Sequence, residues 1–374
     1  MTWRILEGDA RSVLATLPAE SAHCVTTSPP YFGLRNYQVD GQIGLESSPE
    51  AYVDALVAVF REVKRVLHPS GTLWLNLGDS YNGSGGSGGD YRNGGLKDGQ
   101  PRYPGHDVQG LKPKDMIGIP WMTAFALRAD GWYLRQDIIW HKKSCMPESV
   151  TDRCTKSHEY IFMLTKSRQY YYDWMAIAEP ALLTGGAAAK SSIYGPKNAQ
   201  NGGRESSGLG LEWTNPFRNR RDVWMLGPEP FKGAHYATFP TEIPRLCISA
   251  GSSEHGVCSK CGAPWERVIE HKPMQIRKSG RGDAMGEHGR TAASGTMLSQ
   301  AENVTVGWRP TCDHDAPIVS ATVLDPFSGA GTTVMVAQRL GRDGIGIELN
   351  PEYAAMSRAR ITGDCPMFNG EEVA

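Results

Sequence analysis

The sequence predicts an α/β fold in which helices cover both faces of a doubly wound β-sheet. Two observations support this prediction. Residues 1–78 alternate short apolar runs with segments of helical periodicity, which is the pattern of β–α–β units. Residues 318–362 repeat the pattern as strand, glycine-rich turn, helix, strand, acidic residue and helix. Both ends of the chain are therefore predicted to belong to a doubly wound α/β domain.

Length and composition narrow the class of protein. The chain has 374 residues, enough for one large domain or for a core domain with insertions. Its net charge of -1 rules out a polycation, so any nucleic-acid contact must come from local basic patches. No apolar run approaches the roughly 20 residues that cross a bilayer, and the N-terminus lacks a signal-peptide core. We expect a cytoplasmic protein with no membrane partner, whose 8 cysteines are thiols or metal ligands.

The first predicted elements are a short helix (residues 11–17), a buried strand (residues 23–28) and a long helix. The apolar strand is of the type found in parallel sheets. Ser48 can cap the long helix and Pro49 fits its first turn, because an N-cap hydroxyl and an N1 proline both suit a helix start. Gly71 is predicted to end this helix.

A strand at residues 72–79 leads into a glycine-rich stretch, residues 81–106. The composition of this stretch forbids a packed core, which indicates a mobile loop. It is either a passive surface loop or a lid that orders over a substrate. Ordered structure returns with a helix at residues 119–131 and strands at residues 132–142 and 158–167.

The later part of the chain contains two unusual segments. Residues 180–222 are rich in Gly, Ser and Asn, and they carry four arginines: Arg204, Arg218, Arg220 and Arg221. A helix is predicted to start near Thr241. Residues 252–316 then form a cysteine-containing insertion before the last α/β elements.

The run "VLDPFSGAGTT" predicts a binding site for a nucleotide-like cofactor. It ends a strand at Asp325 and opens a helix near Gly331. Glycines let backbone N–H groups approach a ligand closely, and a helix N-terminus favours anionic groups. Glu348 ends the next strand about 20 residues later, where nucleotide-binding βαβ units place a ribose-binding carboxylate. Neither GxGxxG nor GxxxxGK[ST] occurs, so a dinucleotide or P-loop enzyme fits poorly.

A second motif, "TSPPYFG", follows the predicted strand at residues 23–28. Together the two motifs resemble those of DNA amino-methyltransferases, whose catalytic motif has the form (Asp/Asn/Ser)-Pro-Pro-(Tyr/Phe). The catalytic motif precedes the cofactor loop here, which is the circularly permuted order of the β group. The resemblance covers most of residues 1–250 and 318–362. It implies a Rossmann-like class I methyltransferase sheet, S-adenosylmethionine as cofactor and double-stranded DNA as partner.

The resemblance assigns a catalytic role to Ser28, Pro29, Pro30 and Tyr31. The lone pair of an exocyclic amine is delocalised into the base, so the amine needs acceptors for its hydrogens. Ser28 Oγ and the Pro29 carbonyl can be those acceptors, because a Pro-Pro run fixes the backbone. Tyr31 offers a ring for stacking, and the base must flip out of the duplex to reach it.

The resemblance also implies a cofactor site and a target. The implied cofactor-binding residues are Asp9, Asp325, Pro326, Phe327, Ser328, Gly329, Gly331, Thr332, Thr333, Glu348, His235 and Phe239. Serine at the first motif position is commonest in cytosine-N4 enzymes, which favours cytosine over the alternative, adenine N6. The sequence also leaves open the methylation of RNA or protein amines, and a catalytically silent DNA-binding module. A homodimer and a cognate restriction enzyme are further partners to consider.

The implied organisation divides the chain into five parts. They are a catalytic half (1–140), a target-recognition region that starts with core strands (141–235), a core helix (236–251), a Cys/His zinc-ribbon-like insertion (252–316) and a cofactor-binding half (317–374).

The insertion carries two pairs of candidate zinc ligands. Cys258 and Cys261 have the spacing of a zinc knuckle, and Cys312 and His314 supply a second half. The stretch between the pairs is long, and a metal that closes it would give a zinc ribbon. The alternatives are free thiols in a surface insertion, or Asp313 or Asp315 in place of His314.

Overall fold

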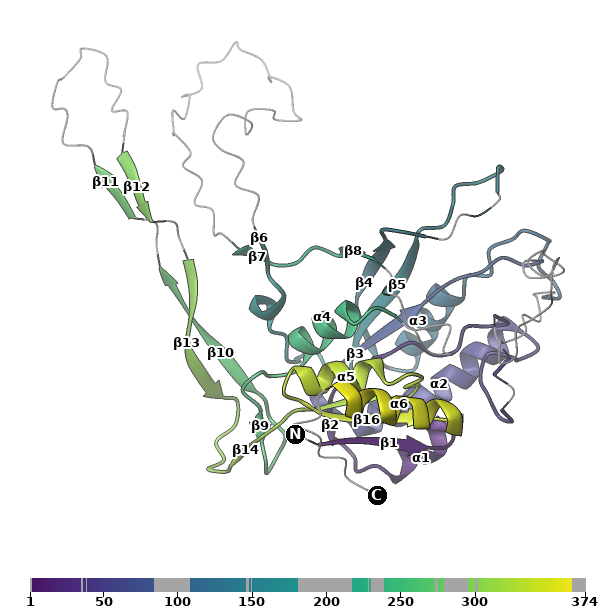
Figure 1. Ribbon diagram of the computed structural model, residues 1–374, viewed down its shortest axis with the longest axis horizontal. Coiled ribbons are helices and arrows are strands. Elements are labelled where there is room, and N and C mark those ends of the chain that lie inside the picture. The colour runs from purple at the N-terminus through teal and green to yellow at the C-terminus, as the bar shows by residue number, and fades with distance from the viewer. Residues whose placement is uncertain are drawn as a thin grey trace, which may run out of the picture. The chain divides into compact units, whose positions relative to one another are not determined.

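A computed structural model (Figure 1) describes residues 2–34, 36–37, 39–83, 108–145, 148, 150–180, 217–227, 229, 239–272, 275–278, 295–299 and 302–364. The chain divides into two compact units. The core unit comprises Met1–Ala176, Arg221–Glu266 and Pro310–Ala374. The inserted unit comprises Ile177–Arg220 and Arg267–Arg309. Each unit is described by itself.

An eight-stranded sheet with the order β1-β16-β15-β2-β3-β5-β4-β8 forms the centre of the core unit. Its strands are β1 (Trp3–Glu7), β2 (Ala22–Thr27), β3 (Leu67–Leu77), β4 (Tyr133–Lys142), β5 (His158–Thr165), β8 (Val223–Leu226), β15 (Thr322–Asp325) and β16 (Asp343–Glu348). Neighbours pair in parallel, except that β5 runs antiparallel to both β3 and β4. The largely parallel sheet predicted from the sequence is confirmed.

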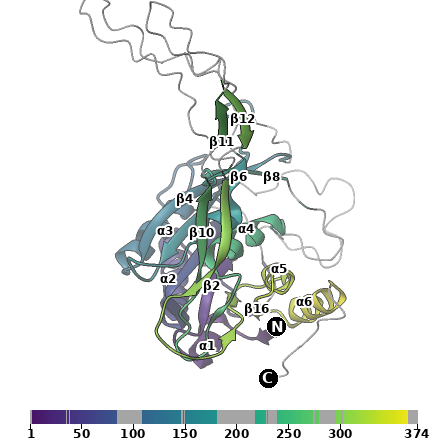
Figure 2. The ribbon, with the colours of Figure 1, turned by 90° about the vertical axis from the view of Figure 1, so that its left-hand side faces the viewer.

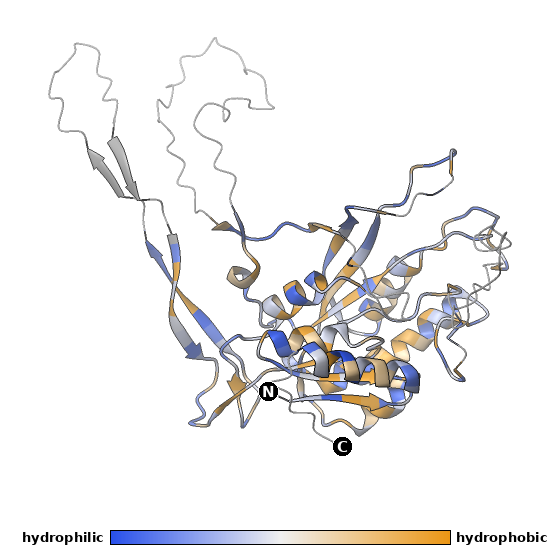
Figure 3. Cartoon of the chain, viewed as in Figure 1, coloured by the Kyte–Doolittle hydropathy of each residue, from blue (hydrophilic) through white to orange (hydrophobic). Residues whose placement is uncertain are grey.

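Helices cover both faces of this sheet (Figure 2). One layer holds α1 (Ala10–Thr16), α2 (Pro49–Val66) and α3 (Ile119–Ala129), and the other holds α4 (Glu242–Gly251), α5 (Thr332–Arg339) and α6 (Pro351–Asp364). Figure 3 shows that the helices carry both apolar and polar residues. A helix with one apolar stripe buries that stripe against the sheet and leaves its polar face in water.

Helix α2 illustrates how local signals fix an element. Ser48 Oγ accepts a hydrogen bond from the backbone N–H of Ala51 at 3.2 Å, and Pro49 occupies the first helical position, as predicted. The predicted end at Gly71 was wrong. The helix stops at Val66, because Leu67 already pairs with Ala22 as the first residue of β3.

The remaining strands of the described chain form four two-stranded pairs. They are β6 (Glu179–Pro180) with β7 (Phe217–Arg218), β9 (Val257–Cys258) with β14 (Ile318–Val319), β10 (Trp265–Lys272) with β13 (Glu302–Pro310), and β11 (Gln275–Lys278) with β12 (Gly295–Ser299). A 3-10 turn, η1, spans Trp174–Ile177. The predicted loop 81–106 lies outside the described residues beyond Gly83. None of the helices in the described part of the chain is both long and apolar enough to cross a bilayer.

Candidate active site

A cavity of about 420 Å³ opens at the carboxyl ends of the parallel strands. Four strand ends contribute to its lining: Gly8–Ala10 after β1, Ser28–Tyr31 after β2, Pro326–Ala330 after β15 and Ile347–Asn350 around the end of β16. Ligands of open α/β sheets bind at this edge, because the loops that follow parallel strands all converge there. The two motifs singled out in the sequence therefore face one cavity.

Two polar side chains from other strands of the sheet, Glu159 and Asn76, hold the Tyr31 hydroxyl in this cavity. The hydroxyl donates to Glu159 Oε2 at 2.6 Å and accepts from Asn76 Nδ2 at 2.6 Å. Asn76 Nδ2 also donates to Glu159 at 2.8 Å, and Lys142 Nζ forms an ion pair with Glu159 Oε1 at 2.5 Å. Burial, followed by the nearby Glu159 charge, raises the pKa of Tyr31 well above its usual value, so the hydroxyl stays a donor. The network fixes the ring at the cavity wall.

The backbone around Tyr31 is fixed as closely as its side chain. A Cβ added to Gly78, directly after β3, would lie 2.6 Å from Tyr31 Cε2, so glycine at this position lets the backbone approach the ring. Tyr52, on helix α2, donates its hydroxyl to the Pro30 carbonyl at 2.8 Å. Ser28 Oγ lies 3.5 Å from the Tyr31 hydroxyl, which is too long for a strong O–H···O bond. The Ser28 hydroxyl is thus only weakly engaged by the protein.

The glycine-rich loop is tied to the next strand by Glu348. Its two carboxylate oxygens accept the backbone N–H of Gly329 at 2.7 Å and of Asn350 at 2.9 Å. Burial raises the pKa of Glu348. Gly331 is the N-cap residue of helix α5 with φ +73°, and a Cβ there would lie 2.2 Å from Ser357 Oγ. The tight turn therefore requires glycine at position 331.

Asp325 lies behind the loop and does not line the cavity. It accepts from Thr27 Oγ1 at 2.6 Å and from the Phe327 N–H at 3.1 Å. Burial is the largest effect on this carboxyl and raises its pKa to about 6. Thr333 donates to the Thr26 carbonyl at 3.2 Å. These contacts connect the loop to strand β2, which carries the Ser-Pro-Pro-Tyr turn.

Most, but not all, of the residues predicted to bind the cofactor line the cavity. Those that line the cavity are Asp9, Pro326, Phe327, Ser328, Gly329, Thr332, Glu348 and Phe239. Asp325, Gly331 and Thr333 support the loop from behind, and His235 lies outside the described residues. Asp9 also caps helix α1, since its Oδ1 accepts the Ser12 N–H at 3.1 Å.

Among the cavity residues that sequence reasoning missed are the three that form the polar network around Tyr31: Asn76, Lys142 and Glu159. Asn76 lies in β3 and Glu159 in β5, both of which are mostly buried, whereas Lys142 ends the more exposed strand β4. A polar residue inside a buried strand, such as Asn76 at 3% exposure, is the signal that could have indicated them, because buried polar groups need partners.

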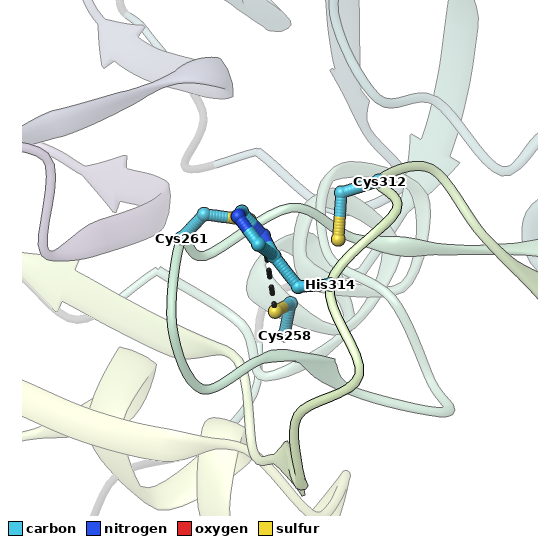
Figure 4. A group of neighbouring side chains, drawn as sticks. All are labelled: Cys258, Cys261, Cys312 and His314. Atoms are coloured by element: carbon cyan, nitrogen blue, oxygen red, sulfur yellow. Dashed lines mark hydrogen bonds between the residues drawn. The ribbon is translucent and has the colours of Figure 1, made fainter.

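The four predicted zinc ligands come together in the core unit (Figure 4). The ligand atoms of Cys258, Cys261, Cys312 and His314 all lie within 4.8 Å of one another. None of the four lines the cavity.

A Ser-Pro-Pro-Tyr turn and a glycine-rich loop that share one cavity on a Rossmann-like sheet define the amino-methyltransferase class. Comparison with known proteins agrees. The sequence model of the DNA methylase family of N6 and N4 amino-methyltransferases matches residues 22–259 and 317–359. The chain belongs to this family and is a DNA methyltransferase.

Individual relatives match almost the whole chain. The type II methyltransferase M.Cfr9I of Citrobacter freundii is 41% identical over 367 residues, which cover 96% of this chain and 88% of the relative. The type II methyltransferase M.SmaI of Serratia marcescens is 39% identical over 358 residues, which cover 96% of this chain and 90% of the relative. Among solved structures, the cytosine-N4-specific PvuII DNA methyltransferase aligns with a TM-score of 0.52 and 16% identity, over 100% of this chain and 89% of that one. That likeness shows the shared fold.

Proposed function

We propose that this chain transfers a methyl group from S-adenosylmethionine to the exocyclic amine of a base flipped out of double-stranded DNA, with cytosine N4 as the favoured target. The observation that carries the proposal is the single cavity lined by both Ser28–Tyr31 and Pro326–Ala330. A methyl donor and a target amine must meet at bonding distance, and one cavity with two distinct walls can hold both.

The residues of the cofactor wall fit S-adenosylmethionine. A carboxylate offers about four lone-pair sites, and Glu348 uses one on Gly329 and one on Asn350. The remaining sites suit the two hydroxyls of a ribose. The Gly329 backbone leaves room for close approach. Bound there, the cofactor supplies an electrophilic methyl group on a sulfonium, so the protein's task is alignment.

The catalytic wall provides the acceptors that the target amine needs. Ser28 Oγ accepts one amine hydrogen, since its contact with Tyr31 is weak. The Pro29 carbonyl accepts the other. The neighbouring Pro30 carbonyl already accepts the Tyr52 hydroxyl, so it is the less suitable acceptor of the two. With both hydrogens bound, the nitrogen lone pair turns toward the methyl donor.

Tyr31 and its polar partners hold the extrahelical base. The Tyr31 ring stacks on the base, and base–aromatic stacking is worth roughly 1–3 kcal/mol per base. Glu159 and Asn76 fix the ring through its hydroxyl, and Lys142 balances the Glu159 charge. The ring is therefore positioned before the base arrives, which lowers the entropy cost of binding.

The preference for cytosine rests on Ser28 at the first motif position, and adenine N6 is the alternative. The test is methylation of random-sequence DNA with labelled cofactor, followed by nucleoside analysis. N4-methylcytosine supports the proposal and N6-methyladenine supports the alternative. 5-Methylcytosine would contradict both, because carbon methylation needs a nucleophile that Ser-Pro-Pro-Tyr lacks. Cofactor binding without methyl transfer to DNA would indicate a catalytically silent DNA-binding module.

DNA recognition is proposed for the region 141–235, with its arginines on phosphates and other side chains on base edges. Arg218 is already paired with Glu179 at 2.8 Å, and Arg220 Nε donates to the Ile177 carbonyl at 2.9 Å. These two arginines therefore also stabilise the inserted unit.

The type II names of the relatives suggest a restriction-modification role with a cognate restriction enzyme. A homodimer is a further proposal. Sedimentation equilibrium tests it, and a measured mass of twice that of one chain would support it.

A further inference from the structure

The cluster of Cys258, Cys261, Cys312 and His314 has the dimensions of a tetrahedral metal site. Ligands about 2.3 Å (sulfur) and 2.0–2.1 Å (nitrogen) from zinc lie roughly 3.5–3.8 Å apart at the corners of a tetrahedron. The Cys258 Sγ to His314 Nδ1 distance is 3.9 Å, and all four ligand atoms lie within 4.8 Å of one another. Binding thus requires only a small contraction of the cluster.

The backbone around the first cysteine pair has the form of a knuckle that points its ligands inward. The Gly262 N–H donates to the Cys258 carbonyl at 2.8 Å, and the Cys258 N–H donates to the Ala263 carbonyl at 2.9 Å. Gly262 takes φ +72°, which favours glycine there.

The second ligand pair is attached to the first by backbone pairing. Strand β9 pairs antiparallel with β14, so that Cys258 lies opposite Ile318, a few residues after His314. The Ser259 N–H donates to the Pro317 carbonyl at 3.0 Å, and Thr311 Oγ1 donates to the Pro264 carbonyl at 2.7 Å. Two chain segments more than forty residues apart in sequence therefore meet at the cluster.

The knuckle also contacts the central sheet. His68 Nε2 lies 3.0 Å from the Cys261 carbonyl oxygen, and the His68 ring stacks on that of His23 with centroids 5.6 Å apart. A Cβ on Gly262 would lie 3.0 Å from His68 and 3.1 Å from His23. His23 Nδ1 in turn accepts the Thr322 N–H at 3.0 Å, at the start of β15. The cluster is thereby joined to the first residues of β2, β3 and β15 and is not an independent surface loop.

We propose that Cys258, Cys261, Cys312 and His314 bind one structural Zn²⁺ that holds together the two points where the chain leaves the core unit and returns to it. The segment Arg267–Arg309 of the inserted unit begins just after Cys261 and ends just before Cys312. A metal cross-link between these points closes the long segment between them and removes conformational freedom from the unfolded chain.

The donor set identifies the metal class and the role. Three thiolates and one imidazole are soft ligands that select zinc over magnesium or calcium. Four protein ligands leave no open position, which is the arrangement of structural rather than catalytic zinc. None of the four lines the cavity, so the metal takes no part in methyl transfer. The site stands whether or not the proposed methylation is correct.

The decisive experiment measures metal content in full-length protein purified without chelator. We expect about one zinc per chain. His314→Gln should lower zinc affinity by more than roughly 100-fold, since even outer-shell partners are worth about 10–100-fold. His314→Cys should retain the metal, because it completes a four-cysteine site. Cys154→Ser is the matched control: Cys154 is an exposed cysteine outside the cluster and should keep the wild-type zinc content.

Two further measurements guard against variants that fail to fold. Cobalt(II) added to metal-free wild-type protein should give sulfur-to-metal charge-transfer bands and tetrahedral d–d absorption. Trypsin should cleave within Arg267–Arg309 faster after zinc removal, while the core unit is cleaved at an unchanged rate. Protein that neither contains zinc nor takes up zinc or cobalt would overturn the site. Equal cleavage rates with and without metal would overturn the closing role.

Discussion

Replacing Ser28 with alanine tests the proposed chemistry most directly, because the change removes one acceptor and little else. The Ser28 hydroxyl makes its protein contact at 3.5 Å, outside the usual 2.5–3.0 Å of an O–H···O bond. Its loss should therefore lower the free energy of unfolding by less than about 1 kcal/mol. The Pro29–Pro30 backbone stays in place, since Tyr52 still holds the Pro30 carbonyl.

Turnover should fall far more than stability. Removing one hydrogen bond that acts on the reacting group in the transition state costs about 2.7–4 kcal/mol at oxyanion holes. We take about 2–4 kcal/mol here, which is a fall in rate of roughly 30- to 1,000-fold. Cofactor affinity should remain near normal, because Ser28 belongs to the turn after β2 and not to the glycine-rich loop that Glu348 holds. An interaction made chiefly in the transition state has this signature.

The assay is single-turnover transfer of labelled methyl groups to DNA at saturating cofactor, with cofactor affinity measured by calorimetry. Ser21→Ala provides the control at the opposite end of strand β2, where the hydroxyl donates to the Pro18 carbonyl at 2.7 Å. That variant should match the wild type. Full turnover by Ser28→Ala would refute the acceptor role. A matching loss of cofactor affinity would show that the cavity had been distorted instead.

Three other changes give distinct expected outcomes. Gly329→Val should abolish cofactor binding, because Gly329 has φ +52° and its backbone N–H donates to Glu348. Calorimetry measures the binding and circular dichroism checks that the variant stays folded. Unchanged binding would refute the cofactor assignment. Tyr31→Ala should weaken binding of the flipped base by roughly 1–3 kcal/mol, measured with a fluorescent base analogue. Tyr31→Phe should keep the stacking. An equal loss of base binding in both variants would mean that the ring does not contact the base. Burial raises the pKa of Asp325 to about 6, so the folded state holds a proton that the unfolded state releases between about pH 4 and 6. Stability should therefore fall as pH rises through that window, by up to about 3 kcal/mol relative to Asp325→Asn, and parallel urea-unfolding profiles of the two proteins would contradict this.

Elements with local signals could be predicted from the sequence. The start of α2 depends on Ser48 and Pro49, which act on their own neighbours, and the start of α5 depends on Gly331 in the same way. The end of α2 was mispredicted because strand pairing decides it: Leu67 belongs to β3 through its pairing with Ala22 across the sheet. Pairing between distant segments leaves little trace in a local stretch of sequence.

The same distinction explains which parts of the site were missed. The two motifs are contiguous runs, so their chemistry can be interpreted before their positions are known. Glu159, Asn76 and Lys142 come from three different strands, and they meet only because β5 runs antiparallel between β3 and β4. That insertion of one antiparallel strand places Glu159 opposite Trp140 and beside the Tyr31 hydroxyl. No spacing along the chain could have revealed the contact.

The order of strands in the sheet has a consequence for how the enzyme is made. Among the strands that the structure describes, β1 pairs with β16 alone, and β15 lies between β16 and β2. Strand β1 therefore gains this neighbour only after Asp343–Glu348 have been synthesised. Non-local pairing of this kind forms late and leaves apolar strands open meanwhile. A nascent chain that carries Ser-Pro-Pro-Tyr but lacks Pro326–Ala330 and Ile347–Asn350 has only part of the cavity lining.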